Sequence, residues 1–367
     1  MGGCDMKKKR FLLLMIVCLV LSMFPAAFAE GTPEERYHTE LNAFRFIYNI
    51  PTAFEAESFA AYSKAAKALR NMDCSSLNEK DLAKLEKIED ARAALVQIAS
   101  PEEVIWEIWG QNMPVATDKA NLVFDDKSFD NEDFRPFLVP YLVNDQNEAK
   151  GNIIVVAGGG YSQRANDGEG YNVAECFRNL GYNCYVLQRR VAPYAKEDIW
   201  LDMQRAVRYL RSQAQEFDLG GMDCVVGMGF SGGSGTVLGA VQYCYGDVQP
   251  TVFDPDYVPD AVDAYHSDMD AVCALYGPNV QMYAEYNGME TENQNLPEMF
   301  VAAGQLDNTG AGKDSLKLVQ SVIDKTKVEF HLFADARHGF SLGLGNNNAS
   351  CWVQMADAFL GRLGNDR

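Results

Sequence analysis

Short apolar runs alternate with amphipathic stretches from about residue 100 to the C-terminus. Continuous apolar runs of this kind are typical of strands that are buried on both faces of a sheet. They predict strands over residues 137–143, 153–156, 185–187, 224–228, 271–275, 299–303 and 328–333. Apolar residues at helical spacing predict helices over 203–210 and 316–323. The alternation predicts an α/β fold: a mostly parallel, doubly wound sheet with helices on both faces.

Residues 30–100 have a helical pattern instead. Ser76 and Glu79 have the spacing of a capping box, which opens a helix. Apolar residues then recur at helical spacing from Leu82 to Ile98. Because this region has no cluster of histidine, cysteine or paired acids, we expect a helical extension packed on a catalytic domain of residues 101–367. A separate docking module is the alternative.

Residues 1–29 have the features of a secretory signal peptide. Lys7 to Arg10 form a basic segment, and residues 11–24 form an apolar segment that is too short to span a bilayer comfortably. Ala27 and Ala29 fit the small-residue pattern of a cleavage site. We therefore expect cleavage after Ala29, a secreted protein and no stable membrane insertion after cleavage. An uncleaved anchor is the alternative.

The net charge and the cysteine content limit the classes of partner and cofactor that we expect. The net charge is −19, and removal of residues 1–29 leaves 28 basic and 50 acidic residues, a net charge of −22. Nucleic acids and anionic membranes require a basic surface, so we expect neither as a partner. Seven of the nine cysteines lie beyond the signal peptide, at wide spacing and without a C-x-x-C pair. We expect buried thiols, at most one disulfide, and no metal or organic cofactor.

The segment 229–233 reads G-F-S-G-G, a G-x-S-x-G motif between a predicted strand and a segment that can continue as a helix. A serine on such a sharp turn projects out of the backbone, and the flanking glycines allow the strained dihedrals. Ser231 is therefore the candidate nucleophile. Ser234 is the weaker candidate because threonine occupies position 236, where the second glycine is needed.

A serine hydroxyl requires a base, usually an imidazole, and an acidic residue that orients this base. Of the four histidines, His338 follows the last predicted strand, where reactive groups of such sheets collect. Asp307 follows the preceding strand and gives the order Ser, Asp, His. Asp335 is the competing acid, but it lies only three residues before His338.

Three consecutive glycines follow the predicted strand 153–156. Such a tract can direct backbone amides at the anion that forms when a serine attacks a carbonyl. The tract is not followed by G-K-[ST], so a phosphate-binding loop is not expected. We assign the oxyanion donors to Gly158, Gly159 and Gly232, and the register within the tract is open.

These motifs resemble the α/β-hydrolase esterases of the acetyl-xylan-esterase and carbohydrate-esterase type, near the hormone-sensitive-lipase-like branch. The resemblance covers roughly residues 130–365. It rests on 158–161 (G-G-G-Y), 190–193 (R-V-A-P), 204–210 (Q-R-A-V-R-Y-L), 229–231 (G-F-S), 338–343 (H-G-F-S-L-G) and Trp352. Many relatives have alanine at 232, histidine near 235 and histidine at 157, where this chain has Gly232, Gly235 and Ala157. These departures surround the acyl pocket and leave the substrate open.

Together with the signal-peptide pattern and the candidate residues, the resemblance implies a secreted serine hydrolase of carboxylic esters, with a triad of Ser231, Asp307 and His338. It also implies a short acyl group, such as acetyl, on a small molecule or an oligosaccharide as the substrate. A serine peptidase of the prolyl-oligopeptidase type is one alternative. A non-catalytic surface binding protein with the same fold is the other.

Overall fold

The computed structural model describes residues 105–110, 112–125, 128–277, 296–343 and 348–363. All of these except Ile105 belong to one compact unit, Trp106–Arg367. The expected signal peptide of residues 1–29 and the expected helical extension of residues 30–100 lie outside the described residues. Within the described part, no helix has both the length and the apolar character that crossing a bilayer requires.

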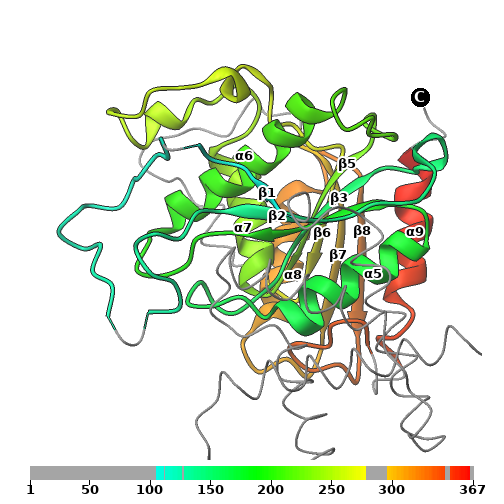
Figure 1. Ribbon diagram of the computed structural model, residues 1–367. Helices are drawn as coiled ribbons and strands as arrows, with labels where there is room; N and C mark the ends of the chain where they lie inside the picture. The colour runs from blue at the N-terminus through cyan, green and yellow to red at the C-terminus, as the bar shows by residue number, and fades with distance from the viewer. Residues whose placement is uncertain (1–104, 111, 126–127, 278–295, 344–347, 364–367) are drawn as a thin grey trace, which may run out of the picture. The chain divides into compact units, whose positions relative to one another are not determined.

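The described residues form one eight-stranded sheet with the order β1-β2-β4-β3-β5-β6-β7-β8 (Figure 1). Its strands are β1 Trp106–Glu107, β2 Phe137–Tyr141, β3 Asn152–Val156, β4 Asn183–Gln188, β5 Val225–Phe230, β6 Ala271–Leu275, β7 Glu298–Gly304 and β8 Val328–Phe333. The pairs β1–β2 and β2–β4 are antiparallel, and all other neighbours are parallel. The prediction of a mostly parallel α/β sheet is confirmed.

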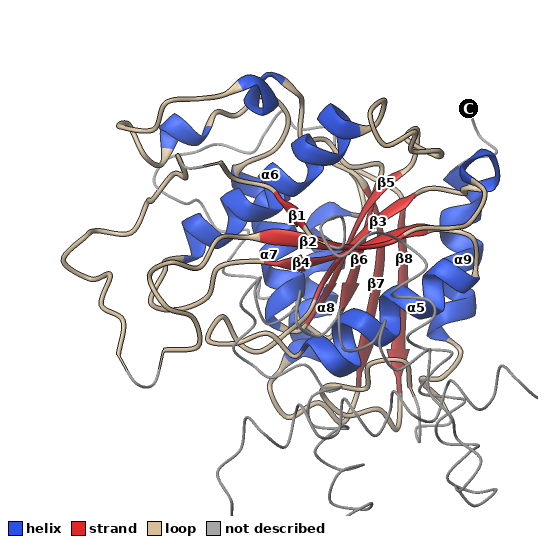
Figure 2. Cartoon of the chain, viewed as in Figure 1, coloured by secondary structure: helices blue, strands red, loops and turns tan. Residues whose placement is uncertain are grey.

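Helices lie on both faces of this sheet (Figure 2). They are α5 Asn172–Asn179, α6 Lys196–Gln213, α7 Gly232–Tyr243, α8 Ala311–Val322 and α9 Trp352–Leu363. Side chains of α6, α7 and α8 share one hydrophobic core. On α5 and α9, the rings of Phe177 and Trp352 lie 5.8 Å apart. Helices therefore cover the central strands from both sides, as a doubly wound fold requires.

Burial on both faces explains why the central strands have no alternation of apolar and polar residues. Every residue of β3, β5 and β6 is buried. Full burial of one valine or isoleucine side chain contributes about 1.5–3 kcal/mol, so these strands form the stable base from which the connecting loops project. The six cysteines in the described part of the chain form no disulfide, and Cys184, Cys224, Cys244 and Cys273 are buried.

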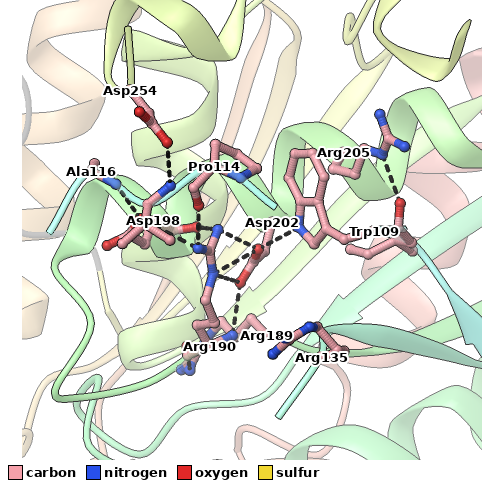
Figure 3. A network of polar contacts seen from close by, with 12 residues as sticks. Trp109, Pro114, Ala116, Arg135, Arg189, Arg190, Asp198, Asp202, Arg205 and Asp254 are labelled. Carbon is pink, nitrogen blue, oxygen red and sulfur yellow. Dashed lines mark hydrogen bonds and ion pairs between the residues drawn. The ribbon is translucent and has the colours of Figure 1, made fainter. Parts of the chain in front are cut away.

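A buried ionic network joins the segment after β1 to the β4–α6 connection (Figure 3). Arg190 Nη2 lies 2.8 Å from the Asp202 carboxylate and Nη1 lies 3.3 Å from Asp198, and all three side chains are completely buried. The indole N–H of Trp109 donates to Asp202 over 2.8 Å, and Arg190 also donates to the carbonyl of Pro114. The network therefore ties the N-terminal segment of the domain to helix α6.

Candidate active site

Ser231 lies at the sharp turn between β5 and α7. Its backbone has φ 50° and ψ −120°, a conformation that costs a residue with a side chain about 1–3 kcal/mol. The Ser231 N–H donates to the carbonyl of Leu275, at the end of the adjacent β6, over 2.9 Å. This bond and the packing of α7 on the sheet hold the strained turn in place.

The glycines of the G-x-S-x-G motif are required by close backbone approaches. A Cβ at Gly229 would lie 2.5 Å from the Gly233 carbonyl oxygen, and a Cβ at Gly233 would lie 1.9 Å from the Val156 carbonyl oxygen. Real Cβ atoms essentially never come within 3.0 Å of such atoms. Any larger residue at either position would therefore displace the turn that carries Ser231.

The structure brings together the three residues that the sequence analysis selected. Ser231 Oγ lies 2.8 Å from His338 Nε2, and His338 Nδ1 lies 2.7 Å from Asp307 Oδ2. Asp307 follows β7 and His338 follows β8, so all three residues lie beyond the carboxyl ends of parallel strands. The Asp307 side chain is fully buried, whereas His338 is 31% exposed. The imidazole is thus held from the protein side and open to solvent on the other.

Thr309 is a further residue of this cluster that the sequence analysis did not identify. Its N–H and its hydroxyl donate to Asp307 Oδ1 over 2.8 and 2.6 Å. The second carboxylate oxygen of Asp307 remains for His338. Asp307 therefore binds Thr309 through Oδ1 and His338 through Oδ2, so the local turn does not compete with the contact to the imidazole. The D-x-T spacing at 307–309 was the signal for this turn.

Ser234, the second serine of the turn, has a structural environment. It is completely buried. Its hydroxyl donates to the carbonyls of Gly229 and Leu275 over 2.7 and 3.0 Å. The hydroxyl therefore fastens α7 to the ends of β5 and β6.

The other described histidines and Asp335 have different partners. His331 Nε2 lies 2.8 Å from the carboxylate of Glu329 within β8, and His266 Nδ1 lies 3.4 Å from Asp268 on the surface. Asp335, the competing acid, accepts a hydrogen bond from an asparagine side chain in the following loop. His38 lies outside the described residues. His338 is thus the histidine that the structure places beside Ser231.

The glycine tract differs from the expectation at Gly158. The Gly158 N–H donates to the carboxylate of Glu169 over 2.8 Å, so this amide is already occupied. Gly232, in contrast, begins α7, where a helix has no acceptors for its first amides. A Cβ at Gly232 would lie 3.0 Å from the nitrogen of Gly160, so the tract and the start of α7 lie side by side.

The described residues contain no group of three or more His, Cys, Asp or Glu side chains that could hold a metal ion. The cluster of Ser231, His338 and Asp307 contains instead the parts needed for acyl transfer: a hydroxyl, a base within hydrogen-bond distance and a carboxylate that orients the base.

Comparisons with known proteins agree with this chemistry. The BD-FAE family model matches residues 140–332, more than half of the chain. Endo-1,4-beta-xylanase B of Butyrivibrio fibrisolvens is 28% identical over an alignment of 231 residues that covers 57% of this chain. This chain spans only 35% of the length of that relative.

Solved structures of hydrolases share the fold. The acetyl ester-xyloside bifunctional hydrolase from Caldicellulosiruptor lactoaceticus has a TM-score of 0.56 at 20% identity and covers 71% of this chain and 96% of its own. A thermophilic esterase from Thermogutta terrifontis has a TM-score of 0.53 at 18% identity and covers 64% of this chain and 91% of its own. The family match over residues 140–332 carries the assignment: the chain belongs to the BD-FAE family of α/β-hydrolase esterases.

Proposed function

We propose that this protein hydrolyses carboxylic esters with Ser231 as the nucleophile, His338 as the general base and Asp307 as the residue that orients His338. The observation that carries the proposal is the continuous hydrogen-bonded chain from Ser231 Oγ through His338 to the buried Asp307 carboxylate. A hydroxyl with an imidazole at 2.8 Å can lose its proton as it attacks a carbonyl carbon.

The reaction follows in two halves. Ser231 Oγ bonds to the ester carbon while its proton passes to His338 Nε2, and the tetrahedral intermediate then breaks its bond to the alcohol oxygen, which takes that proton. The acyl group remains on Ser231. Water gives a proton to His338 as it attacks the acyl carbon, and the carboxylic acid leaves as the proton returns to Ser231. Asp307 stabilises the charged imidazole throughout.

The oxyanion formed in each half requires amide donors. We assign this role to Gly232 with the neighbouring amides of Gly159 and Gly160. Gly158 is omitted because its N–H already binds Glu169. Loss of a single oxyanion donor typically raises the barrier by about 3–4 kcal/mol, so the conformation of this tract matters as much as the triad.

For the substrate, we propose a short acyl group, acetyl above all, on a carbohydrate or a small alcohol. The supporting observations are the names of two similar proteins, an endo-1,4-beta-xylanase and an acetyl ester-xyloside hydrolase. The signal-peptide pattern of residues 1–29 fits an enzyme that meets such polymers outside the cell. The net charge of −19 argues against nucleic acid as a partner.

A substrate panel tests this function. We expect turnover of p-nitrophenyl acetate to exceed that of longer p-nitrophenyl esters, acetate release from acetylated xylan, and no cleavage of aminoacyl-p-nitroanilides. Ser231→Ala should lower kcat by about 10⁴-fold or more with normal folding. Ser234→Ala is the matched control, because it removes the neighbouring serine hydroxyl, and it should retain turnover. Full activity of a folded Ser231→Ala variant, or anilide cleavage in place of ester cleavage, contradicts the proposal.

A further inference from the structure

A buried glutamate lies behind the glycine tract. Glu169 is part of the π-helical turn Asp167–Tyr171 and is 9% exposed. Its Oε2 accepts the Gly158 N–H and its Oε1 accepts the hydroxyl of Tyr276, each over 2.8 Å. Burial raises the pKa of this carboxyl group, while the hydrogen bonds from Tyr276 and Gly158 oppose the shift. π-Helical turns occur frequently at functional sites.

The peptide group between Ala157 and Gly158 lies between two charged side chains. Glu169 accepts its N–H, and Nη2 of the fully buried Arg189 donates to its carbonyl oxygen, on Ala157, over 3.2 Å. Burial lowers the pKa of Arg189 to about 10, so the guanidinium is charged at neutral pH. Hydrogen bonds to charged groups are stronger than neutral ones. The negative group faces the positive end of the peptide dipole and the positive group faces its negative end, so this peptide is firmly oriented.

Glu169 is also connected to the loop of His338. The Tyr276 hydroxyl, which donates to Glu169, accepts the N–H of Ser341 over 3.1 Å. The ring of Tyr276 lies edge-on to the His338 imidazole, with 5.3 Å between centroids. The Ser341 hydroxyl donates to the carbonyl of Gly168, the neighbour of Glu169. One turn of the chain thus contacts both the glycine tract and the segment that follows the base.

We propose that Glu169 is a positioning residue, whose carboxylate fixes the glycine tract relative to the His338 loop. The inference rests on the proposed function of Ser231. An oxyanion donor is effective only if it points at the oxygen of the same carbon that Ser231 attacks, and a displacement of about 1 Å can cost 100-fold in rate. Fixing both segments through one carboxylate supplies that alignment. The hydrogen bonds of Glu169 go to Gly158 and Tyr276, and it therefore acts through these groups.

Glu169→Gln tests this role with little change of shape. The carboxamide has one oxygen that accepts and one nitrogen that donates, so it cannot accept from both Gly158 and Tyr276. We expect kcat on p-nitrophenyl acetate to fall by about 10- to 100-fold, with KM within about threefold of the wild-type value, because the interaction acts on the transition state. Affinity for a trifluoromethyl ketone, which forms a tetrahedral oxyanion on the serine, should weaken by a similar factor. Rates are normalised to sites titrated with a fluorophosphonate.

Asp263→Asn is the matched control. Asp263 is also a buried carboxylate that accepts a tyrosine hydroxyl, that of Tyr257, over 2.7 Å, and it lies 3.1 Å from Arg205. Arg205 belongs to α6 and Tyr257 to the loop before Asp263, so neither partner lies in the loops that carry Ser231, Asp307 and His338. We expect Asp263→Asn to lower the melting temperature while kcat and affinity for the ketone stay at wild-type values.

Tyr276→Phe is a second test. It removes the hydroxyl that joins Glu169 to the Ser341 N–H but keeps the Gly158–Glu169 and Ser341–Gly168 bonds, so it should lower kcat by a smaller factor. Wild-type kcat and ketone affinity in folded Glu169→Gln overturn the inference. If that variant does not fold, wild-type kcat in Tyr276→Phe overturns it and a reduced kcat at unchanged KM supports it. If the wild-type protein hydrolyses esters no faster than Ser231→Ala, the proposed function is wrong. If kcat falls in Ser231→Ala but stays at the wild-type value in Glu169→Gln and Tyr276→Phe, only the role of Glu169 is wrong.

Discussion

Two clusters of acidic and basic side chains in this domain have the same kinds of contact and different consequences. Arg190 is bound by Asp198 and Asp202 in a site without solvent exposure. His338 contacts Asp307 through one ring nitrogen and the hydroxyl of Ser231 through the other, and its side chain is 31% exposed. In the first cluster, hydrogen-bond acceptors surround the guanidinium of Arg190. In the second, the His338 ring lies between the Asp307 carboxylate and the Ser231 hydroxyl, which can react.

The two clusters differ in whether they can transfer a proton and whether a substrate can reach them. Arginine stays protonated at any physiological pH, so the Arg190 site holds two segments together and transfers no proton. An imidazole can take up and release a proton during a reaction, and the exposure of His338 on one side lets a substrate reach it. Similar hydrogen bonding therefore produces a structural connection in one place and a proposed catalytic site in the other.

The largest expected effect is that of His338→Gln, which removes the base from the second cluster. We expect kcat/KM for p-nitrophenyl acetate to fall by about 10⁴- to 10⁶-fold, because the serine then has no proton acceptor. The melting temperature should stay close to the wild-type value, because the side chain is partly exposed. Stopped assays combined with thermal melts give both values, and an unchanged kcat/KM would disprove the assignment.

Asp307→Asn should have the next largest effect. The amide retains the shape and one acceptor but loses the negative charge that stabilises protonated His338, and comparable changes in other triads cost about 10⁴-fold in kcat. Asp335→Asn is the matched control for the competing acid and should retain most of the turnover. The opposite ranking of these two variants would transfer the role to Asp335.

Asp202→Asn is the corresponding change in the first cluster. It leaves Arg190 buried without its closest negative partner, which typically costs about 3–5 kcal/mol of unfolding free energy. We expect a shift of the urea midpoint with kcat unchanged for the folded fraction. Loss of kcat without loss of stability would show that the two clusters are coupled.

Thr309→Val should have the smallest effect. It removes the hydroxyl that donates to Asp307 but preserves the N–H bond and the size of the side chain. Removal of a hydrogen bond to a charged group costs about 1.5–3 kcal/mol, and because the N–H bond remains, we expect kcat/KM to fall by about tenfold. Wild-type kcat/KM would show that the N–H bond alone holds Asp307.

The strands and the cluster of Ser231, Asp307 and His338 could be predicted from the sequence for physical reasons. Burial on both faces leaves almost only apolar residues and glycines in β3, β5 and β6, so each strand can be recognised from its own sequence. The parallel arrangement then fixes one edge of the sheet as the place where loops after strands meet. This rule, together with the chain order Ser, Asp, His, selected Asp307 and His338 before the contacts of His338 with Ser231 and Asp307 were known.

Other features depend on packing that no local pattern reports. The tract at Gly159 and Gly160 has φ values of 112° and 61°, and glycine admits many such conformations, so the direction of the Gly158 amide could not be predicted. Glu169 lies in a π-helical turn without a sequence signal. The pairing of Arg190 with Asp202 depends on how β4 and α6 pack, and the segment that follows the two-residue strand β1 joins it only in the folded domain.

Covalent labelling shows directly whether Ser231 is the nucleophile. A fluorophosphonate probe is incubated with the wild-type protein and with Ser231→Ala, and the modified peptide is located by mass spectrometry. We predict a single adduct, on Ser231, that forms in proportion to the loss of esterase turnover and is absent from the alanine variant. Complete inactivation with the adduct on another residue, or ester turnover that persists with Ser231 fully modified, would contradict the account.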